Sequence, residues 1–458
     1  MARTEATLPG GARLADYLAV GYLALNCSLG EVKEALVKCG VHTRLRRDMP
    51  REVLVYFVMA MCLYPRVAYE EVFRLVIEGL RRIYGDQVRD AQVSKAAISQ
   101  GRARLGWQVM RELFARQAAQ RPRTAGDDYA GYRVMSVDGS TLDVPDEKVN
   151  AEAFGYAQGG RGEAAYPQIR FVALAECATH ALCEVQMGGV CDDSEQALTR
   201  QLFPAFSDDM LVLADRLFYG YDMWRDAVAT GAKLLWRVKS NLRLPCEVPL
   251  ADGSYLSTVY ASDTDRRHQR NGMRVRVIEY RLEGVPDAEP QYRLITNLLD
   301  AAVAPAIELA ALYHRRWKIE EMFDEIKTHL CDGKKVLRSK TPDLVRQEFY
   351  ALMLTHAAIR RLMYEAAQDS GQRPEDLSFV HAVRVLNRRL PEAAAVPPFY
   401  EQWQSWRHSL LREIASGRAV QSRGKRNPRG VKRKMSNFRI RRRWEPLNQR
   451  IAPKVVIK

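Results

Sequence analysis

The sequence lacks the features that mark a secreted, membrane-spanning or zinc-binding protein. None of its eight cysteines forms a C-x-x-C pair, and no histidine completes a zinc pattern around Cys177, Cys183 and Cys191. The longest nearly unbroken apolar run, Val53 to Tyr64, is far shorter than the roughly 20 residues of a membrane span. The first residues contain no apolar core of a signal peptide. We therefore expect a cytoplasmic protein with free thiols.

Acidic residues are nearly missing from the C-terminal end. Residues 418–458 hold 15 lysines and arginines but a single acid, Glu445, so this segment accounts for +14 of the net charge of +15. Such a block is either a solubilising tail or a contact to nucleic acid. The residues that we expect to contact DNA in this segment are Arg429, Lys432, Arg433 and Lys434.

The remaining sequence is that of a globular protein with several regions. Its 458 residues are 47% apolar, which is enough to bury a sizeable core. Apolar spacing and turn signals predict a helical N-terminal domain (1–125), the first part of an α/β core (126–240), a β-rich insertion (241–304), the remainder of the core with an acid-bearing helix (305–400) and a basic C-terminal region (401–458).

One segment of the helical N-terminal domain is a candidate DNA contact. Residues 92–114 combine small side chains with Arg102 and Arg104, and Ser94 and Gly106 are suited to start and interrupt a helix. Small residues with spaced arginines suit a helix laid against DNA. An ordinary helical hairpin fits the same pattern equally well.

The predicted core places two aspartates at the ends of apolar strands. Three strands are followed by a helix, a strand, a helix and a strand, and the strand–helix–strand units favour a parallel part of the sheet. Asp138 ends the run "RVMSVD" and Asp215 follows the run "MLVLA". An acid at the carboxyl end of a buried strand lies at the edge where α/β sheets place their sites.

The stretch "YHRRWKIEEMFDEIK", residues 313–327, is predicted to be an amphipathic helix with charges of both signs. At 100° per residue, its polar side chains Tyr313, Arg316, Glu320 and Lys327 fall in a stripe about 60° wide beside the apolar face. A salt-bridged surface helix is the ordinary interpretation, because Glu–Arg pairs at this spacing stabilise helices. A metal-binding acid flanked by phosphate-binding bases is the sharper one.

Three carboxylates are therefore expected to converge: Asp138, Asp215 and Glu320. Crowded carboxylates repel one another unless a cation neutralises them, and hard oxygen ligands suit Mg²⁺ or Mn²⁺. Two such ions about 4 Å apart can clamp the attacking and leaving oxygens of a phosphodiester displacement. Spacing alone does not exclude the neighbouring acids Asp143, Asp222, Glu321 and Asp324.

These motifs resemble the DDE transposases of bacterial insertion sequences, in the group with the Y-(2)-R-(3)-E-(6)-K signature. The residues 313, 316, 320 and 327 fit that spacing without a gap. The stretches "SVDGSTLDVPD" and "LVLADRLFYGY" resemble the blocks that carry the first and second aspartate, and "NPRGVKRKMSNF" resembles the basic C-terminal block. The resemblance extends over roughly residues 20 to 445.

The resemblance implies a fold and roles for residues. The fold is a ribonuclease-H-like α/β catalytic core with a β-rich insertion, preceded by an all-helical N-terminal domain and followed by a basic C-terminal region. Asp138, Asp215 and Glu320 become the metal-binding triad for Mg²⁺ or Mn²⁺. The residues implied to contact transposon-end DNA are Tyr313, Arg316 and Lys327.

The implied activity is DNA transposition. Such an enzyme hydrolyses the DNA at the ends of its element and joins the freed 3′-hydroxyls to target DNA, and synapsis of two ends implies a homodimer on double-stranded DNA. The implied location is the bacterial cytoplasm, at the nucleoid. Two alternatives remain open: a metal-dependent nuclease of the same fold that cuts without joining, and a catalytically silent DNA-binding protein derived from a transposase.

Two departures from the family pattern affect the expected site. Leu217 stands where the family often has glycine, and residues 242–316 contain no tryptophan to stack on a flipped base. The aromatic residues of the insertion that remain for stacking are Tyr255, Tyr260, Tyr280 and Tyr292.

Overall fold

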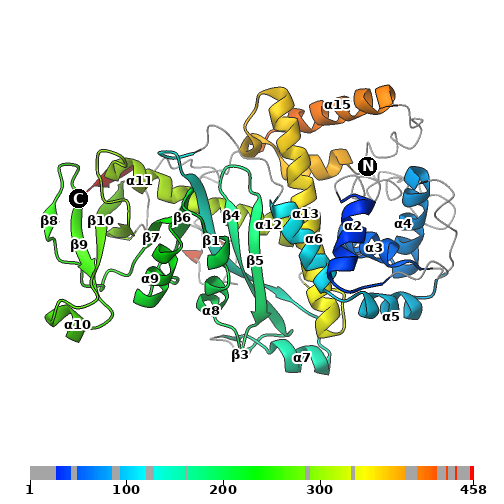
Figure 1. Cartoon of the computed structure of the whole chain (residues 1–458), viewed down its shortest axis with the longest axis horizontal. Helices are drawn as coiled ribbons and strands as arrows, with labels where there is room; N and C mark the ends of the chain where they lie inside the picture. The colour runs from blue at the N-terminus through cyan, green and yellow to red at the C-terminus, as the bar shows by residue number, and fades with distance from the viewer. Residues whose placement is uncertain are drawn as a thin grey trace.

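The computed structural model is a mixed α/β structure in which a long central sheet adjoins a helical unit (Figure 1). It describes residues 27–42, 49–84, 93–119, 128–159, 162–283, 289–331, 336–386, 400–419, 430–431, 439–440 and 454–457. The fold class is therefore confirmed as α/β with helices before the sheet. The four basic residues predicted in the C-terminal block, Arg429, Lys432, Arg433 and Lys434, lie outside the described residues.

The described residues of the N-terminal region are helical, as predicted. The helix α3 is buried along almost its whole length, which explains why it contains the longest apolar run of the sequence. Ser94 caps α5 by accepting a hydrogen bond from the Ala97 amide, and Gly106 ends the helix with a positive φ of 77°, which glycine adopts without steric cost. The helices are α2 (Leu29–Lys38), α3 (Arg51–Leu63), α4 (Tyr69–Tyr84), α5 (Lys95–Leu105) and α6 (Gln108–Ala119).

The first half of the sheet has the predicted mixture of strand directions. Its order is β5-β4-β1-β6-β7, in which β1 pairs antiparallel with β4 and parallel with β6, and β6 pairs parallel with β7. The strands are β1 (Arg133–Asp143), β4 (Gln168–Glu176), β5 (Leu182–Gly189), β6 (Met210–Ala214) and β7 (Lys233–Arg237), and the helices α8 (Glu195–Arg200) and α9 (Tyr221–Ala229) lie in the connections.

The strands of the β-rich region continue the same sheet. β11 pairs antiparallel with β7, and the order continues as β11-β10-β9-β8. The C-terminal strand β14 (Lys454–Ile457) pairs antiparallel with β10, so the chain returns to this end of the sheet. The strands are β8 (Val248–Pro249), β9 (Tyr255–Val259), β10 (Met273–Glu283) and β11 (Tyr292–Thr296), and α10 (Asp263–Arg267) lies between β9 and β10.

Residues 313–327 do not form the single regular α-helix that we expected. The segment is divided into α11 (Ala306–Tyr313), a 3₁₀ turn η3 (His314–Trp317), α12 (Lys318–Asp324) and a π-helical segment η4 (Glu325–Leu330). A 3₁₀ turn is tighter and a π turn is wider than an α turn. The helical projection at 100° per residue is therefore wrong in detail for this segment.

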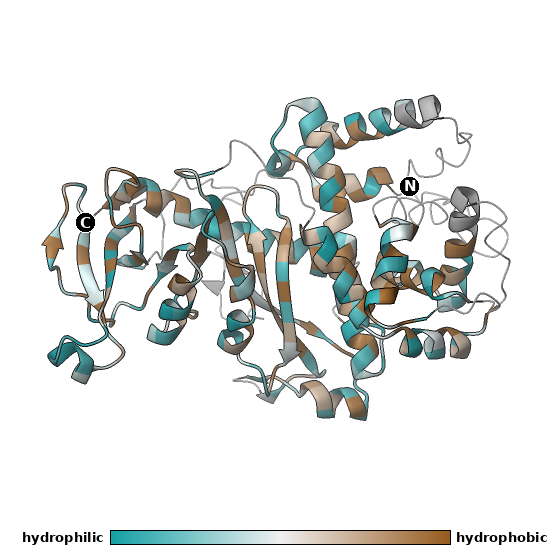
Figure 2. Ribbon diagram, viewed as in Figure 1, coloured by the Kyte–Doolittle hydropathy of each residue, from teal (hydrophilic) through white to brown (hydrophobic). Residues whose placement is uncertain are grey.

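A long helix joins the helical unit to the sheet. α13 (Pro342–Ser370) packs against α3, α6 and α15 (Tyr400–Ser416), and its apolar face shares one core with α12 and with β1, β4 and β5. Phe171 of β4 contacts Phe323 of α12 with ring centroids 5.2 Å apart. Figure 2 shows the hydrophobic residues gathered on α3 and on the strands, whereas the outlying α10 is hydrophilic.

The other described elements are short. They are α7 (Lys148–Phe154), η2 (Phe203–Ala205), η5 (Pro374–Asp376), and the strand pairs β2 (Gln158–Gly159) with β3 (Gly162–Glu163) and β12 (Gly430–Val431) with β13 (Arg439–Ile440). Within the described part of the chain, no helix is both long and apolar enough to cross a membrane.

Candidate active site

The register between β1 and β6 brings the two predicted aspartates to one place. Ser136 of β1 lies opposite Leu213 of β6 in a parallel ladder, so that two residues further along Asp138 is level with Asp215. β6 ends at Ala214, and Asp215 follows directly. We expected β1 to end at Asp138, but the strand continues to Asp143, because β4 pairs with it as far as that residue.

Arg316 connects this sheet edge to the acid-bearing helix. Its Nη1 donates to Asp138 Oδ2 at 2.9 Å, and its Nη2 lies 3.9 Å from Glu320 Oε1. The arginine is only 4% exposed, whereas the Glu320 side chain is 44% exposed. The Ser136 hydroxyl donates to the Arg316 carbonyl at 3.4 Å, which holds the 3₁₀ turn against β1. The guanidinium therefore bridges two of the three predicted carboxylates.

The two outer residues of the predicted stripe also face the sheet. The Tyr313 hydroxyl donates to the carbonyl of Ala214, the residue before Asp215, at 3.4 Å. Lys327 Nζ donates to Ser140 Oγ at 3.0 Å, two residues beyond Asp138 on β1. Tyr313, Arg316 and Lys327 thus contact β1 or the end of β6, and Glu320 lies beside them through its contact with Arg316.

Burial and like charges act together on Asp138. Burial raises the pKa of Asp138 to about 6, with Arg316 opposing the shift and the negative charges of Glu320 and Asp215 adding to it. Burial lowers the pKa of Arg316, but the net pKa is raised because Tyr313 and these three carboxylates surround the guanidinium. The three acids therefore lie within electrostatic reach of one another around a single cation.

The neighbouring acids that spacing could not exclude have other partners. Asp143 accepts a hydrogen bond from Gln168 at 2.6 Å on the antiparallel strand. Glu321 pairs with Lys318 at 3.0 Å and Asp222 with Arg225 at 2.7 Å. Asp324 accepts from Thr328 at 2.6 Å. Asp143 is thus engaged by the neighbouring strand β4 and the other three acids by residues three or four positions away, whereas Arg316 pairs with Asp138 and Glu320.

The chemistry of the three acids suits a hard divalent cation. All three offer carboxylate oxygens, and the pKa of Asp138, which is raised by burial and further by the charges of Glu320 and Asp215, is one that a bound cation would lower. Among the described residues, no three histidine, cysteine, aspartate or glutamate side chains lie close enough together to hold a metal ion as they stand. The three carboxylates therefore suit a metal by their chemistry, while in this structure Arg316 donates a hydrogen bond to one of them, Asp138.

Comparison with known proteins identifies the family. Residues 18–115 match the model of the insertion element 4 transposase N-terminal region, and residues 129–357 match that of the transposase DDE domain. The chain belongs to the DDE transposases. This family assignment confirms the resemblance inferred from the motifs.

Two curated transposases of Escherichia coli K12 are similar to this transposase. The transposase InsG for insertion sequence element IS4 is 26% identical over 377 residues, which cover 80% of this chain and 82% of InsG. The putative transposase InsZ is 28% identical over 194 residues, which cover 42% of this chain and 62% of InsZ. The piggyBac transposase in its synaptic complex with hairpin DNA superposes with a TM-score of 0.44 and 10% identity, over 87% of this chain and 85% of that one.

The structure contradicts the predicted DNA contact at Arg102. This arginine is 1% exposed, and its guanidinium donates to Gln347 Oε1 and to Ser339 Oγ, both at 2.9 Å. It lies inside because α5 turns that side toward α13 rather than toward solvent. Arg104 is exposed and contacts Gln100 at 3.4 Å, so its role in DNA binding stays a prediction.

The tyrosines considered for base stacking are not equivalent. Tyr280 is fully buried and stacks on Tyr292 with ring centroids 5.2 Å apart, so it is not available to a base in this structure. Tyr292 is in turn covered by the guanidinium of Arg237 at 4.8 Å. Tyr260 is partly exposed, with Arg266 at 5.2 Å from its ring. Tyr260 and Tyr292 are thus both partly exposed, whereas Tyr280 is not.

A buried charged group next to α12 was missed in the sequence. Glu325 follows α12 directly and contacts His356 and Arg360 of α13. On an ideal α-helix Glu325 does not fall on the apolar face, so its burial was not predicted. The π-helical segment that begins at this residue changes its orientation. The usable signal was the pair of basic residues four apart in the otherwise apolar run "LMLTHAAIRRLM" of α13.

Proposed function

We propose that this transposase binds the terminal repeats of its insertion sequence, hydrolyses the DNA at those ends and joins the freed 3′-hydroxyls to target DNA. The observation that carries the proposal is the contact of Arg316 with both Asp138 and Glu320, beside the strand end that precedes Asp215. An acid of β1 and an acid of α12 thus share one cation beside the strand end that precedes Asp215, within a chain of the DDE transposase family.

We assign the metal-binding role to Asp138, Asp215 and Glu320. Their oxygen donors suit Mg²⁺ or Mn²⁺, and a bound ion of this kind neutralises crowded carboxylates and polarises phosphodiester oxygens. In this proposal the ribonuclease-H-like core consists of strands β1, β4, β5, β6 and β7 and the helices between them. Its support is the strand order β5-β4-β1-β6-β7, with Asp138 on β1 and Asp215 after β6.

Arg316, Lys327 and Tyr313 have positioning roles in this proposal. Arg316 holds the Asp138 carboxylate in a fixed orientation, and its charge attracts the DNA backbone to the sheet edge. Lys327 lies on the same side, at Ser140, and offers a second cation to a phosphate. Contacts to phosphates position DNA without reading its sequence. Base recognition is therefore assigned to other parts of the chain.

The test is a strand-transfer assay with the full-length protein. Duplexes carrying the inverted repeats that border the coding sequence are incubated with a supercoiled target plasmid and Mg²⁺. The expected products are duplexes cut at the repeat boundary and duplexes joined through their 3′ ends to the plasmid. Cleavage without joined product supports a nuclease, and binding without cleavage supports a silent DNA-binding protein. Two ends joined in one complex are expected if the active form is a homodimer.

A further inference from the structure

A buried polar network lies at the end of the helix that carries Glu320. Glu325, 8% exposed, accepts hydrogen bonds from Arg360 Nε and from His356 Nε2, both at 2.9 Å. Arg360 Nη2 also donates to the second carboxylate oxygen, so the arginine grips Glu325 through two nitrogens. Arg360 and His356 are both on α13, one turn apart, and both are buried.

His180 joins the network from the turn between β4 and β5. Its Nδ1 lies 2.7 Å from Arg360 Nη2 and 3.4 Å from Glu325 Oε1. Because a guanidinium only donates, Nδ1 accepts, and the ring proton is on Nε2, 4.0 Å from Glu321 Oε2. His180 has a positive φ of 56°, a conformation that is uncommon outside glycine but that histidine and asparagine adopt more readily than most residues. The network thus ties α12 to the sheet as well as to α13.

The network contains one ion pair and two neutral histidines. Burial lowers the pKa of His356 to about 3, and burial followed by the charge of Arg360 lowers that of His180 well below its usual value. The carboxylate of Glu325 is therefore balanced by Arg360. A buried ion pair of this kind often gives no more stability than apolar residues of the same size. Its specific contribution is geometric, because the paired groups fit in a single arrangement.

α12 is consequently held at both ends. Before the helix, Arg316 is bound to Asp138, and after it, Glu325 is bound to Arg360 of α13, which in turn donates to His180. Glu320 lies between the two attachments, with a half-exposed side chain. Two attachments on different sides of a short helix fix its rotation about its own axis. That rotation decides where the Glu320 carboxylate points.

We propose that Glu325, held by His356 and by Arg360, which itself donates to His180, is a positioning residue that aims Glu320 at Asp138 and Asp215. The π-helical segment starts at Glu325, which places this residue against α13 while Lys327 still reaches β1. π-helical turns are frequent at functional sites. The inference rests on the proposed cleavage activity, and it concerns the geometry of Glu320 rather than contact with DNA.

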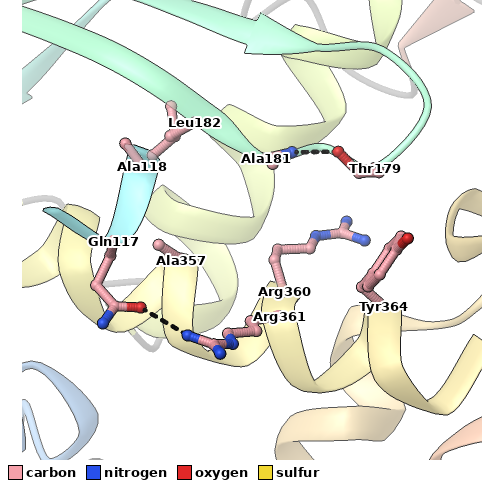
Figure 3. A pocket seen from close by; sticks show the side chains of 9 residues that line it. All are labelled: Gln117, Ala118, Thr179, Ala181, Leu182, Ala357, Arg360, Arg361 and Tyr364. Atoms are coloured by element: carbon pink, nitrogen blue, oxygen red, sulfur yellow. Dashed lines mark hydrogen bonds between the residues drawn. The ribbon is translucent and has the colours of Figure 1, made fainter. Parts of the chain in front are cut away.

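Two neighbouring arginines of α13 offer a matched pair for the test. Both line a small pocket between α6, α13 and the turn after β4, and Figure 3 shows that they point in different directions. Arg360 extends toward Thr179, whereas Arg361 reaches Gln117 of α6 at 3.4 Å. A lysine in place of either arginine retains the charge but cannot donate as a two-pronged group. Only Arg360→Lys is therefore expected to loosen Glu325.

The experiment compares cleavage of the inverted-repeat duplex by Arg360→Lys, Arg361→Lys and the unmodified protein at saturating DNA and Mg²⁺. Arg360→Lys is expected to lower the turnover rate about 10- to 100-fold, as small misplacements of catalytic groups do, with unchanged affinity for the duplex. Arg361→Lys is expected to leave both quantities unchanged. Equal turnover rates for the two variants would overturn the proposal.

Two further variants separate positioning from general stability. Glu325→Gln removes the negative charge of the network. Glu348→Gln is the control: it removes the charge of a buried glutamate on α13 that accepts hydrogen bonds from the Arg338 amide and the Ser339 hydroxyl. At a temperature below both melting temperatures, only Glu325→Gln is expected to lose turnover. A loss that is equal in the two variants contradicts positioning.

A milder variant covers the case in which these proteins do not fold. His180→Asn keeps a residue type that tolerates positive φ, and it removes the ring that links Arg360 to the sheet. A reduced turnover rate with unchanged duplex affinity is expected, and an unchanged rate would count against the network. If the unmodified protein itself does not cleave, the proposed function fails and not this inference alone.

Discussion

Two arginines of this transposase are buried to a similar extent, one in the N-terminal helices and one at the sheet edge. Arg102 is 1% exposed and Arg316 is 4% exposed. The partners of Arg102 are an amide and hydroxyls, from Gln347, Ser339 and Tyr69, and they join α5 to α13, to the segment before α13 and to α4. The partners of Arg316 are carboxylates, Asp138 and the half-exposed Glu320. The extent of burial therefore does not distinguish the two arginines. Their roles differ because the partners of Arg102 are neutral, whereas those of Arg316 are charged and partly accessible.

The largest effect is expected at the sheet edge. Arg316→Ala removes the cation between Asp138 and Glu320, and we expect the rate of end cleavage to fall by about 10²- to 10³-fold, the cost of losing a preorganised charge-stabilising donor. The measurement is single-turnover cleavage of the inverted-repeat duplex, with circular dichroism as the check on folding. A folded variant that cleaves at nearly the normal rate would show that Arg316 is a structural ion pair.

A second effect is expected on stability alone. Arg102→Ala leaves the Gln347 and Ser339 side chains without their buried partner, and the free energy of unfolding should fall by roughly 2–4 kcal/mol. Chemical denaturation measures this loss, and Arg104→Ala, on the exposed side of the same helix, is the control expected to change stability little. If Arg102→Ala instead weakened DNA binding without affecting stability, the distinction between the two arginines would be lost.

The smallest effect is expected from the basic C-terminal block. Each phosphate contact contributes roughly 0.9 to the slope of log affinity against log salt concentration. Replacing Lys432, Arg433 and Lys434 by glutamine should therefore lower that slope by about 2 to 3 if all three contact phosphates. Affinity measured at several salt concentrations gives the slope. An unchanged slope would indicate a solubilising role and would leave the sheet edge and the helices as the DNA-binding surfaces.

The sequence was sufficient to predict the elements that place the acids. Apolar runs marked β1 and β6, so that Asp138 and Asp215 were assigned to strand ends, and the parallel register of these strands makes them level. The length of β1 was not predictable, because its last residues are strand only through pairing with β4. The four side chains of the stripe were predicted to share one face; three of them contact the sheet, and Glu320 contacts Arg316 beside it.

Tertiary partners account for what the sequence did not reveal. Spaced arginines on a helix gave the same pattern whether they face DNA or α13, and Arg102 faces α13. Helical periodicity does not distinguish α from 3₁₀ or π turns over a few residues, so the segment around Glu325 was read as regular. Tyr280 was a stacking candidate until its burial under Tyr292 was visible.

The central claim is that Asp138, Asp215 and Glu320 form one metal-dependent site, in contrast to the acids beside them. The direct measurement is Mg²⁺-dependent cleavage of the inverted-repeat duplex by Asp138→Asn, Asp215→Asn, Glu320→Gln and the control Asp143→Asn, whose carboxylate is engaged by Gln168. The account predicts that each of the first three abolishes cleavage while duplex binding remains, that Asp143→Asn cleaves within a few-fold of normal, and that chelation of the metal stops the unmodified enzyme. Near-normal cleavage by any of the first three variants would contradict it.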